Sequence, residues 1–190
     1  MKPFVWIAAI MALGGCATSG SSPKYGYLPG DDYTYYAALK PVDLEKRHFR
    51  VVVTDARSST SIGCSGIALP RNTELEGQKG IAFFSTYLRK MIESNNGIVD
   101  DASTDVIDVR LKGLSGELTG FLYITVWGLV EFEVARGSQV KYYCSAMSDG
   151  DPGAPLGKTS VDTRTGAFRK MVSASTRQAI DVLMVDLARK

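Results

Sequence analysis

The stretch that decides the fold runs from VIDVRLKGL (106–114) through FLYITVWGLVEFEV (121–134) to QVKYYCSAM (139–147). Apolar and polar residues alternate in all three segments, and a period of two is typical of half-buried β-strands. Arg136-Gly137-Ser138, between the second and third segments, is typical of a tight hairpin turn. The sequence therefore predicts three consecutive antiparallel strands.

Residues two apart share a face of a strand, so the alternation also predicts which side chains are buried. In the second strand the apolar face holds Leu122, Ile124, Val126, Val130, Phe132 and Val134. In the third strand we expect the apolar face to hold Val140, Tyr142, Cys144 and Ala146.

The segments on either side add one strand and two helices. Residues 49–57 (FRVVVTDAR) are rich in β-branched residues and predict a strand. Residues 73–76 fit a capping box and begin a predicted helix that ends near Asn95, and a second amphipathic helix is predicted over about residues 166–188. Since each helix has one apolar stripe, the simplest fold is α+β, an antiparallel sheet of about four strands with both helices packed on one face.

The composition limits the classes of function. A length of 190 residues fits one domain with an appendage, and a formal net charge of +2 gives no general attraction to nucleic acid. His48 is the only histidine, so a multi-histidine metal site is excluded. The sequence contains no P-loop, dinucleotide-binding or nucleophile-elbow motif. We therefore expect no catalytic residue, no metal site and no enzyme activity.

The beginning of the chain predicts its compartment. The apolar run from Phe4 to Leu13 is too short to cross a bilayer but has the length of a signal-peptide core. Leu13-Gly14-Gly15-Cys16 resembles the bacterial lipobox, in which the cysteine sulfur receives a diacylglyceryl group and the freed amine is usually acylated, for example with palmitate. We expect a signal peptide over residues 1–15 and lipid on Cys16, with no other cofactor. The alternative is an ordinary secretory signal with a chance cysteine.

The residue after the lipidated cysteine bears on the membrane that holds the protein. Ala17, rather than an aspartate, follows Cys16. By resemblance to enterobacterial sorting, this favours the periplasmic face of the outer membrane over retention at the inner membrane.

A tyrosine-rich segment follows the anchor. We expect residues 16–48 to form a lipidated tether and residues 49–190 to form a periplasmic domain. Five of the nine tyrosines lie between residues 25 and 36. Either their rings pack on the domain, or they form a contact strip for a partner, with Tyr33, Tyr35 and Tyr36 as candidates.

Two cysteines remain once Cys16 carries lipid. In an oxidising compartment Cys64 and Cys144 are a possible disulfide, and closing so long a loop would stabilise the fold by about 4–5 kcal/mol at most. The alternative is two unpaired cysteines that behave as small buried apolar residues.

The outer face of the second strand offers a candidate interaction surface. Tyr123, Trp127 and Leu129 would lie on the face away from the helices. An apolar patch there often marks a partner site. Alternatively, a loop or the tyrosine-rich segment covers it.

Several segments, together with the lipobox, carry a family resemblance. They are Val53-Thr54-Asp55-Ala56-Arg57, Ile62-Gly63, Tyr87-Leu88-Arg89-Lys90-Met91-Ile92 and Ala179-Ile180-Asp181-Val182-Leu183. With them the chain resembles small outer-membrane lipoproteins of the YajG type and, more loosely, the lipopolysaccharide-assembly lipoproteins. The resemblance implies a non-enzymatic periplasmic lipoprotein and transfers no functional residue.

These observations predict a lipid-anchored envelope lipoprotein that acts as a non-catalytic binding, accessory or scaffold subunit at the outer membrane. Its partner would be another envelope protein or a lipid, and not nucleic acid; the oligomeric state is not predicted. The alternative is a lipid- or glycolipid-binding auxiliary lipoprotein of an envelope transport or assembly system. Acyl chains would then lie between the helices and the sheet.

Overall fold

The computed structural model describes residues 27–28, 35–57, 60–61, 69–70, 75, 77–120, 124–155 and 164–189. The long elements are β3 (His48–Asp55), α1 (Gln78–Ser94), β7 (Val106–Thr119), β8 (Thr125–Arg136), β9 (Gln139–Ser148) and α2 (Arg164–Ala188). The two-residue strands are β1 (Tyr27–Leu28), β2 (Tyr35–Tyr36), β4 (Thr60–Ser61), β5 (Leu69–Pro70) and β6 (Ile98–Val99). The fold is α+β, with a mixed five-stranded sheet of order β6-β3-β7-β8-β9 and two helices.

The prediction of an antiparallel sheet of about four strands is wrong for the half of the sheet that contains β6 and β3. β3 pairs in parallel with both β6 and β7, whereas β7, β8 and β9 are antiparallel as predicted. The chain passes from β3 through α1 to β6 and β7, and a helical crossover returns the chain in its original direction. The strands that flank α1 therefore run parallel.

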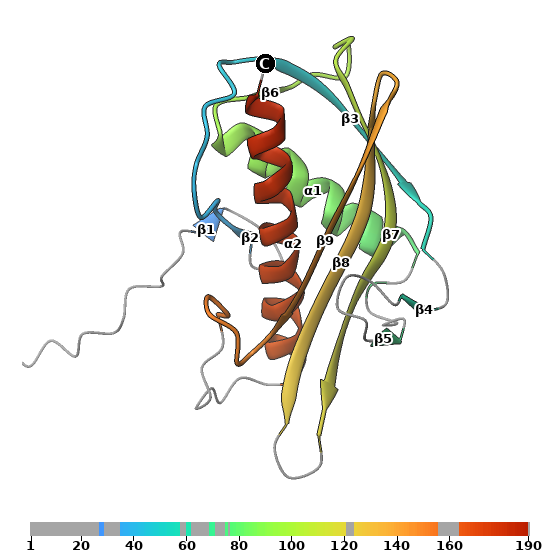
Figure 1. The fold of residues 1–190 in the computed structure, drawn as a ribbon, viewed down its shortest axis with the longest axis vertical. Coiled ribbons are helices and arrows are strands. Elements are labelled where there is room, and N and C mark those ends of the chain that lie inside the picture. The colour runs from blue at the N-terminus through green and yellow to red at the C-terminus, as the bar shows by residue number, and fades with distance from the viewer. Residues whose placement is uncertain are drawn as a thin grey trace, which may run out of the picture.

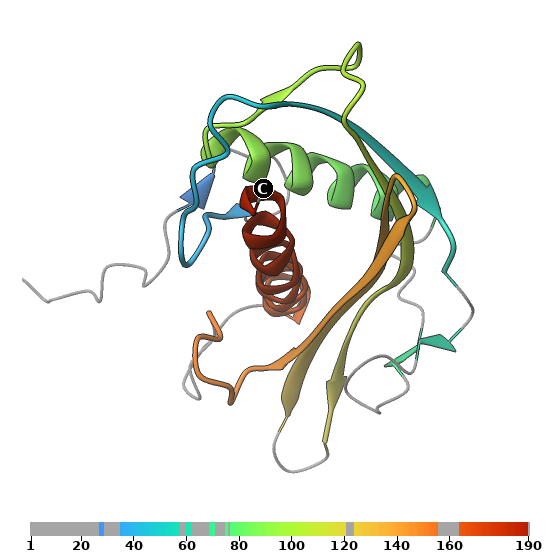
Figure 2. The ribbon, with the colours of Figure 1, turned by 45° about the horizontal axis from the view of Figure 1, so that its top comes forward.

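Both helices lie on the same side of the sheet, which confirms the predicted layering (Figures 1 and 2). The sheet curves around them, with α1 against β3 and α2 against β8 and β9. The predicted stripe of α2 is buried along its length, at Phe168, Val172, Ser175, Ala179, Leu183 and Leu187. α1 begins at Gln78 after Gly77, with no side-chain hydrogen bond at its N-cap; Thr73 and Glu76, the ends of the predicted capping box, lie outside the described residues.

Two glycines allow α2 to approach the sheet closely. Gly116 of β7 is paired with Gly128 of β8, and a Cβ at either position would collide with α2, at Phe168 and Met171 respectively. Gly116 lies inside β7, which extends beyond the strand segment predicted over residues 106–114.

The face of β9 that meets the helices is the opposite of the predicted one. Val140 and Tyr142 are 63% and 55% exposed, whereas Tyr143, Ser145 and Met147 are buried. The cause is the two-residue turn, which pairs Arg136 with Gln139, so that even-numbered residues of β8 lie opposite odd-numbered residues of β9.

A β-bulge at Lys112 makes a similar change in β7. Ile107, Val109 and Leu111 face the core before the bulge, and Leu114 faces it afterwards. An extra residue in one strand shifts which side chains share a face. None of the helices described in the structure is long and apolar enough to span a membrane.

Candidate functional site

At Tyr35 and Tyr36 the tyrosine-rich segment is part of the core, which removes these two residues from the candidate contact strip and favours the alternative that the rings pack on the domain. Tyr35 and Tyr36 are 2% and 1% exposed, and Tyr33 lies outside the described residues. The Tyr36 N–H donates to the Tyr87 hydroxyl oxygen at 2.8 Å, and the Tyr87 hydroxyl donates to the Tyr36 carbonyl at 3.0 Å. Burial raises the pKa of Tyr87 well above its usual range. Because Leu44 is also fully buried, the packed part of the chain includes residues assigned to the tether.

A carboxylate of α2 holds the same segment. Asp181 Oδ2 accepts a hydrogen bond from the Leu39 N–H at 3.1 Å. Burial raises the pKa of Asp181 to about 6, against the lowering effects of that hydrogen bond and of the Arg177 charge. The Arg177 guanidinium is fully buried and lies 5.4 Å from the centre of the Tyr36 ring. The interactions around Tyr36 and Leu39 are therefore structural.

The predicted outer patch is only partly exposed. Leu129 is fully buried although it faces away from the helices, which removes it from the candidate surface. Trp127 is half-buried, and its Nε1–H donates to Thr119 Oγ1 at 3.2 Å. β4 and β5 lie beside β7 on this side of the sheet (Figure 2), which favours the alternative of a covering loop. Tyr123 is outside the described part of the chain.

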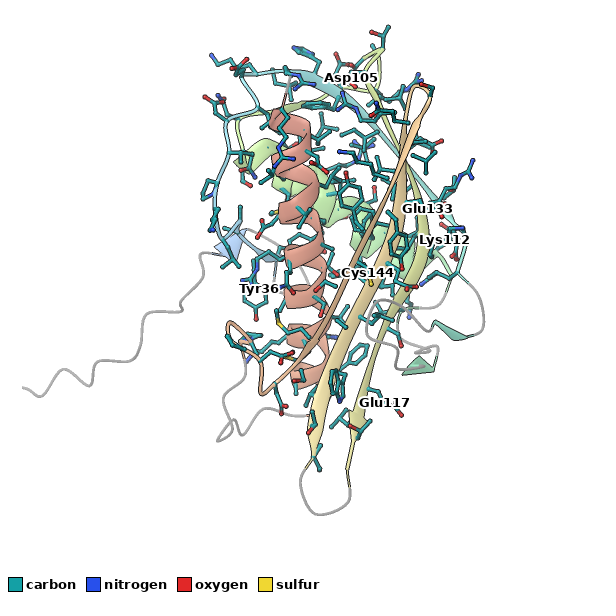
Figure 3. The ribbon with its side chains drawn as sticks, viewed as in Figure 1. Tyr36, Asp105, Lys112, Glu117, Glu133 and Cys144 are labelled. Carbon is teal, nitrogen blue, oxygen red and sulfur yellow. The ribbon has the colours of Figure 1, made fainter. Side chains whose placement is uncertain are left out.

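Cys144 lies on the same outer face of β9 (Figure 3). It is opposite Glu131, whose carboxylate accepts a hydrogen bond from the Tyr142 hydroxyl at 2.7 Å. Burial and that bond raise the pKa of Tyr142 to about 12. Cys144 is disulfide-bonded. Cys64 is not among the described residues, so its pairing with Cys144 stays a prediction, as does the lipid on Cys16.

The single histidine occupies a structural position. His48 Nδ1 lies 2.9 Å from Asp100 Oδ2, at an exposed edge where β3 begins. This hydrogen bond lowers the pKa of the Asp100 carboxyl. Within the described ranges, no group of three or more His, Cys, Asp or Glu side chains is placed to hold a metal ion.

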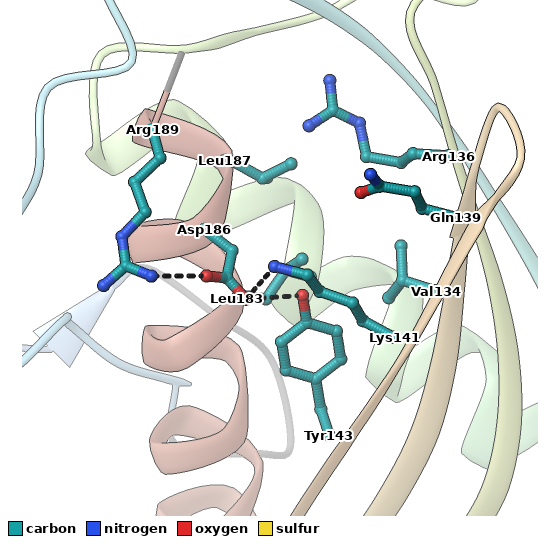
Figure 4. A pocket seen from close by; sticks show the side chains of 9 residues that line it. All are labelled: Val134, Arg136, Gln139, Lys141, Tyr143, Leu183, Asp186, Leu187 and Arg189. Atoms are coloured by element: carbon teal, nitrogen blue, oxygen red, sulfur yellow. Dashed lines mark hydrogen bonds and ion pairs between the residues drawn. The ribbon is translucent and has the colours of Figure 1, made fainter.

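A pocket that the sequence analysis missed lies between the β8–β9 hairpin and the last turns of α2 (Figure 4). Its volume is about 360 Å³. It is lined by Val134, Arg136, Gln139, Lys141, Tyr143, Leu183, Asp186, Leu187 and Arg189. Val134, Leu183 and Leu187 are buried and form its apolar part, while its other side chains are polar or charged.

Asp186 is the acceptor for three donors in this pocket. Its carboxylate accepts from the Tyr143 hydroxyl at 3.0 Å and lies 3.3 Å from both Lys141 Nζ and Arg189 Nη1. Burial and this hydrogen bond raise the pKa of Tyr143, so its phenol stays protonated near neutral pH.

A second carboxylate stands beside the pocket. Asp105 accepts from Arg136 with both oxygens at 2.8 Å, and from Arg47 at 3.2 Å. The site is therefore a polar network with cations in excess.

The pocket follows from the observed register. Gln139, Lys141 and Tyr143 are alternate residues of β9 on the helix side. Leu183 and Asp186 of α2 and Arg189, which follows the end of α2, are spaced three residues apart. With β9 assigned to the wrong face, the charged side chains were expected to face solvent. The sequence did contain a signal for these side chains. A two-residue turn places even-numbered residues of β8 opposite odd-numbered residues of β9, and this register puts Lys141 and Tyr143 on the helix side.

Comparisons with known proteins give likenesses of shape alone. No protein-family model matches the chain, and none of the curated proteins matches it either. Three solved structures that resemble it are a Xanthomonas campestris protein of family-model DUF330, rare lipoprotein B of Shewanella oneidensis and a minor lipoprotein of Acinetobacter baumannii.

The likeness to these structures is weak. In that order, identity is 13%, 19% and 12%, the TM-scores are 0.40, 0.38 and 0.30, and 82%, 73% and 78% of this chain is covered. The matches span 92%, 93% and 91% of the three solved chains. At these scores they carry no argument on function, and the resemblance to the YajG type stays a prediction.

Proposed function

We propose that this protein is a lipid-anchored envelope lipoprotein whose folded domain is a non-catalytic binding subunit at the periplasmic face of the outer membrane. The observation that carries the proposal is Leu13-Gly14-Gly15-Cys16 after an apolar run of signal-peptide length. Two acyl groups or more on Cys16 would hold the protein stably, because each buried CH₂ contributes about 0.8 kcal/mol.

The start of the packed chain supports an anchored domain. Tyr35 is the first residue with a described buried side chain. Fully extended, the residues between Cys16 and Tyr35 reach at most about 65 Å. A lipid on Cys16 would therefore confine the domain to the space next to one membrane.

The pocket supports a binding role. It combines an apolar part with charged and hydrogen-bonding side chains, a combination that is common in ligand sites. Its ionisable side chains pair with one another, as Asp186 does with Lys141 and Arg189. The partner would be another envelope protein or a lipid, with Arg136 and Lys141 at the contact.

Binding of a lipid or glycolipid is the second candidate function. The space between the helices and the sheet does not favour it, because Phe84, Leu88 and Phe132 are fully buried there and pack into one cluster. The observation that favours it is the pocket, where apolar side chains lie beside cations.

The anchor is tested by labelling cells with a palmitate analogue. We expect label in the wild-type protein and none in Cys16→Ser, because only the Cys16 sulfur and the amine it frees are acylated. Cys144→Ser is the matched control and should keep the label. Unlabelled wild-type protein would contradict the anchor.

The two binding roles are separated by native mass spectrometry of the full chain, extracted from envelopes in a non-ionic detergent. A bound envelope protein that is lost in Arg136→Gln supports the scaffold role. A retained lipid that is lost in the same variant supports the second candidate.

A further inference from the structure

The pocket beside α2 presents more donors than acceptors. Arg136, Lys141, Arg189 and the Tyr143 hydroxyl all donate, and among the described residues of the lining Asp186 is the only carboxylate. Figure 4 shows Lys141, Tyr143 and Arg189 directed at Asp186, with Arg136 and Gln139 across the gap. The empty space therefore lies between two groups of donors.

The charges around this space do not cancel. Four cations, Arg47, Arg136, Lys141 and Arg189, surround two carboxylates, Asp105 and Asp186. Among these described residues the surplus is positive, and it lies at one end of the domain. An anion that enters would meet guanidinium and ammonium groups that existing ion pairs already orient, and such pre-orientation lowers the entropic cost of binding.

The end of α2 is the feature that opposes an anion here, because the last carbonyls of a helix carry partial negative charge. Arg47 offsets it, since its Nη1 donates to the Leu187 carbonyl at 2.6 Å. Arg136 and Lys141 both come from the hairpin, on the wall opposite α2, and Lys141 reaches across to Asp186 (Figure 4). The hairpin therefore supplies the anion-attracting wall.

The size and the apolar part of the pocket limit the ligand. A volume of about 360 Å³ is at the small end of small-molecule sites. Val134, Leu183 and Leu187 would contact a short apolar group. Arg136 can bind two oxygens of a phosphate at once, and Lys141 can bind a third as a point charge.

We propose that this pocket binds a phosphate monoester, with Arg136 and Lys141 on the phosphate oxygens and the ester-linked carbon group against Leu183 and Leu187. In this arrangement the phosphate competes with Asp105 for Arg136, and with Asp186 for Lys141 and Arg189. The proposal names the ligand of the site to which the proposed function assigns binding, and it does not depend on the lipid anchor.

Binding is measured by titration calorimetry on the full chain in a non-ionic detergent, with glycerol phosphate as the probe. We expect saturable binding that weakens about tenfold in Arg136→Gln and in Lys141→Gln, because each loses a hydrogen bond between charged groups. Asp186→Asn should bind more tightly, since it removes the internal competitor while keeping the shape of the side chain.

The matched control is Lys112→Gln, which removes the same charge outside the pocket, where Lys112 pairs with Glu133 at 3.4 Å (Figure 3). It should bind like the wild type. Equal binding by Lys112→Gln, Arg136→Gln and Lys141→Gln would overturn the proposal. So would an Asp186→Asn variant that binds no more tightly than the wild type. Thermal unfolding of each variant shows that a loss of binding is not a loss of fold.

A second measurement identifies the source of the phosphate. Flotation of the Cys16→Ser chain with phosphatidylcholine vesicles, with and without phosphatidic acid, tests a lipid headgroup. Flotation that requires both phosphatidic acid and Arg136 assigns the site to a headgroup. Saturable binding of glycerol phosphate without such flotation assigns it to a soluble ester, and the absence of both overturns the proposal. Neither outcome bears on the palmitate label, so this proposal and the anchor fail separately.

Discussion

The two sides of the sheet are closed by different means. On the helix side, Val130, Phe132 and Val134 of β8 pack against two helices, and residues 35–44 close over those helices in turn. On the outer side, Leu129 of the same strand is equally buried, while Val140 and Tyr142 of the neighbouring strand are exposed. β8 is therefore covered on both faces, whereas β9, at the edge of the sheet, is covered on only one.

This difference explains why the two sides were predicted with different success. On the helix side, β8 and α2 repeat one pattern over many residues, and their buried faces were predicted correctly, whereas the face of β9 was not. The outer side depends on a local cover near β7 and on a cysteine cross-link at Cys144, neither of which has a periodic signal. It also separates roles: the helix side and the hairpin form the pocket, and the outer side adds stability.

The largest expected effect is on the helix side. Phe132 is fully buried, and its ring centre lies 4.9 Å from that of Phe84 and 5.2 Å from that of Tyr143. Phe132→Ala should lower the free energy of unfolding by about 3–5 kcal/mol, because it removes these contacts and leaves a cavity. Denaturant unfolding measures it, and a loss below about 1 kcal/mol would show that the helices do not close this side.

The outer side is tested by Leu129→Ala. Because the side chain is fully buried, we expect a loss of about 2–3 kcal/mol, measured in the same way. Val140→Ala on the same side, at a residue 63% exposed, is the control and should change stability by less than about 0.5 kcal/mol. Equal small effects for both variants would mean that the outer cover is not part of the stable fold.

The attachment of residues 35–44 is tested by Tyr87→Phe. The change deletes a hydroxyl that both accepts from and donates to the Tyr36 backbone, and it leaves that buried N–H and carbonyl without the hydroxyl. We expect a loss of about 1–2 kcal/mol and faster amide exchange at Tyr36. Phe84→Leu, at a ring that makes no such bond, should not speed exchange at Tyr36; equal exchange rates in the wild type and Tyr87→Phe would refute the attachment.

The last test concerns pH. The pKa of Asp181 is raised from 3.8 to about 6, so between these values the folded protein holds a proton that the unfolded chain has released. The free energy of unfolding should therefore fall as pH rises from about 4 to 6, and Asp181→Asn should remove that part of the fall. Urea unfolding at several pH values measures it.

The control is Asp101→Asn, which removes the same charge at a carboxylate whose side chain is 81% exposed. In this variant the free energy of unfolding should still fall as the pH rises from about 4 to 6. An identical pH dependence in wild type and Asp181→Asn would contradict the burial of this carboxyl.

Most of the elements were predictable from the sequence, and most of the site was not. The stripe of α2 and the alternation in β8 each recur over several turns or pairs, so Phe168, Leu183 and Phe132 were correctly expected in the core. The parallel pairing of β3 with β7 follows from the crossover through α1, a rule of connection rather than of composition. The bulge at Lys112 has no local sequence signal.

The pocket depends on register across the fold. Tyr143 and Asp186 are 43 residues apart and meet only because α2 packs along β9. The pattern in a single sequence predicts which face of each element is buried. It does not predict which residues of two packed elements lie opposite one another. The charged residues of the hairpin were therefore visible in the sequence, whereas their convergence was not.

The most direct test of the account is the intact mass of the mature protein extracted from cell membranes. The account predicts a chain that begins at Cys16 and carries a diacylglyceryl group on the sulfur and an acyl group on the amine. A chain that keeps residues 1–15, or one that begins at another residue and carries no lipid, would contradict it.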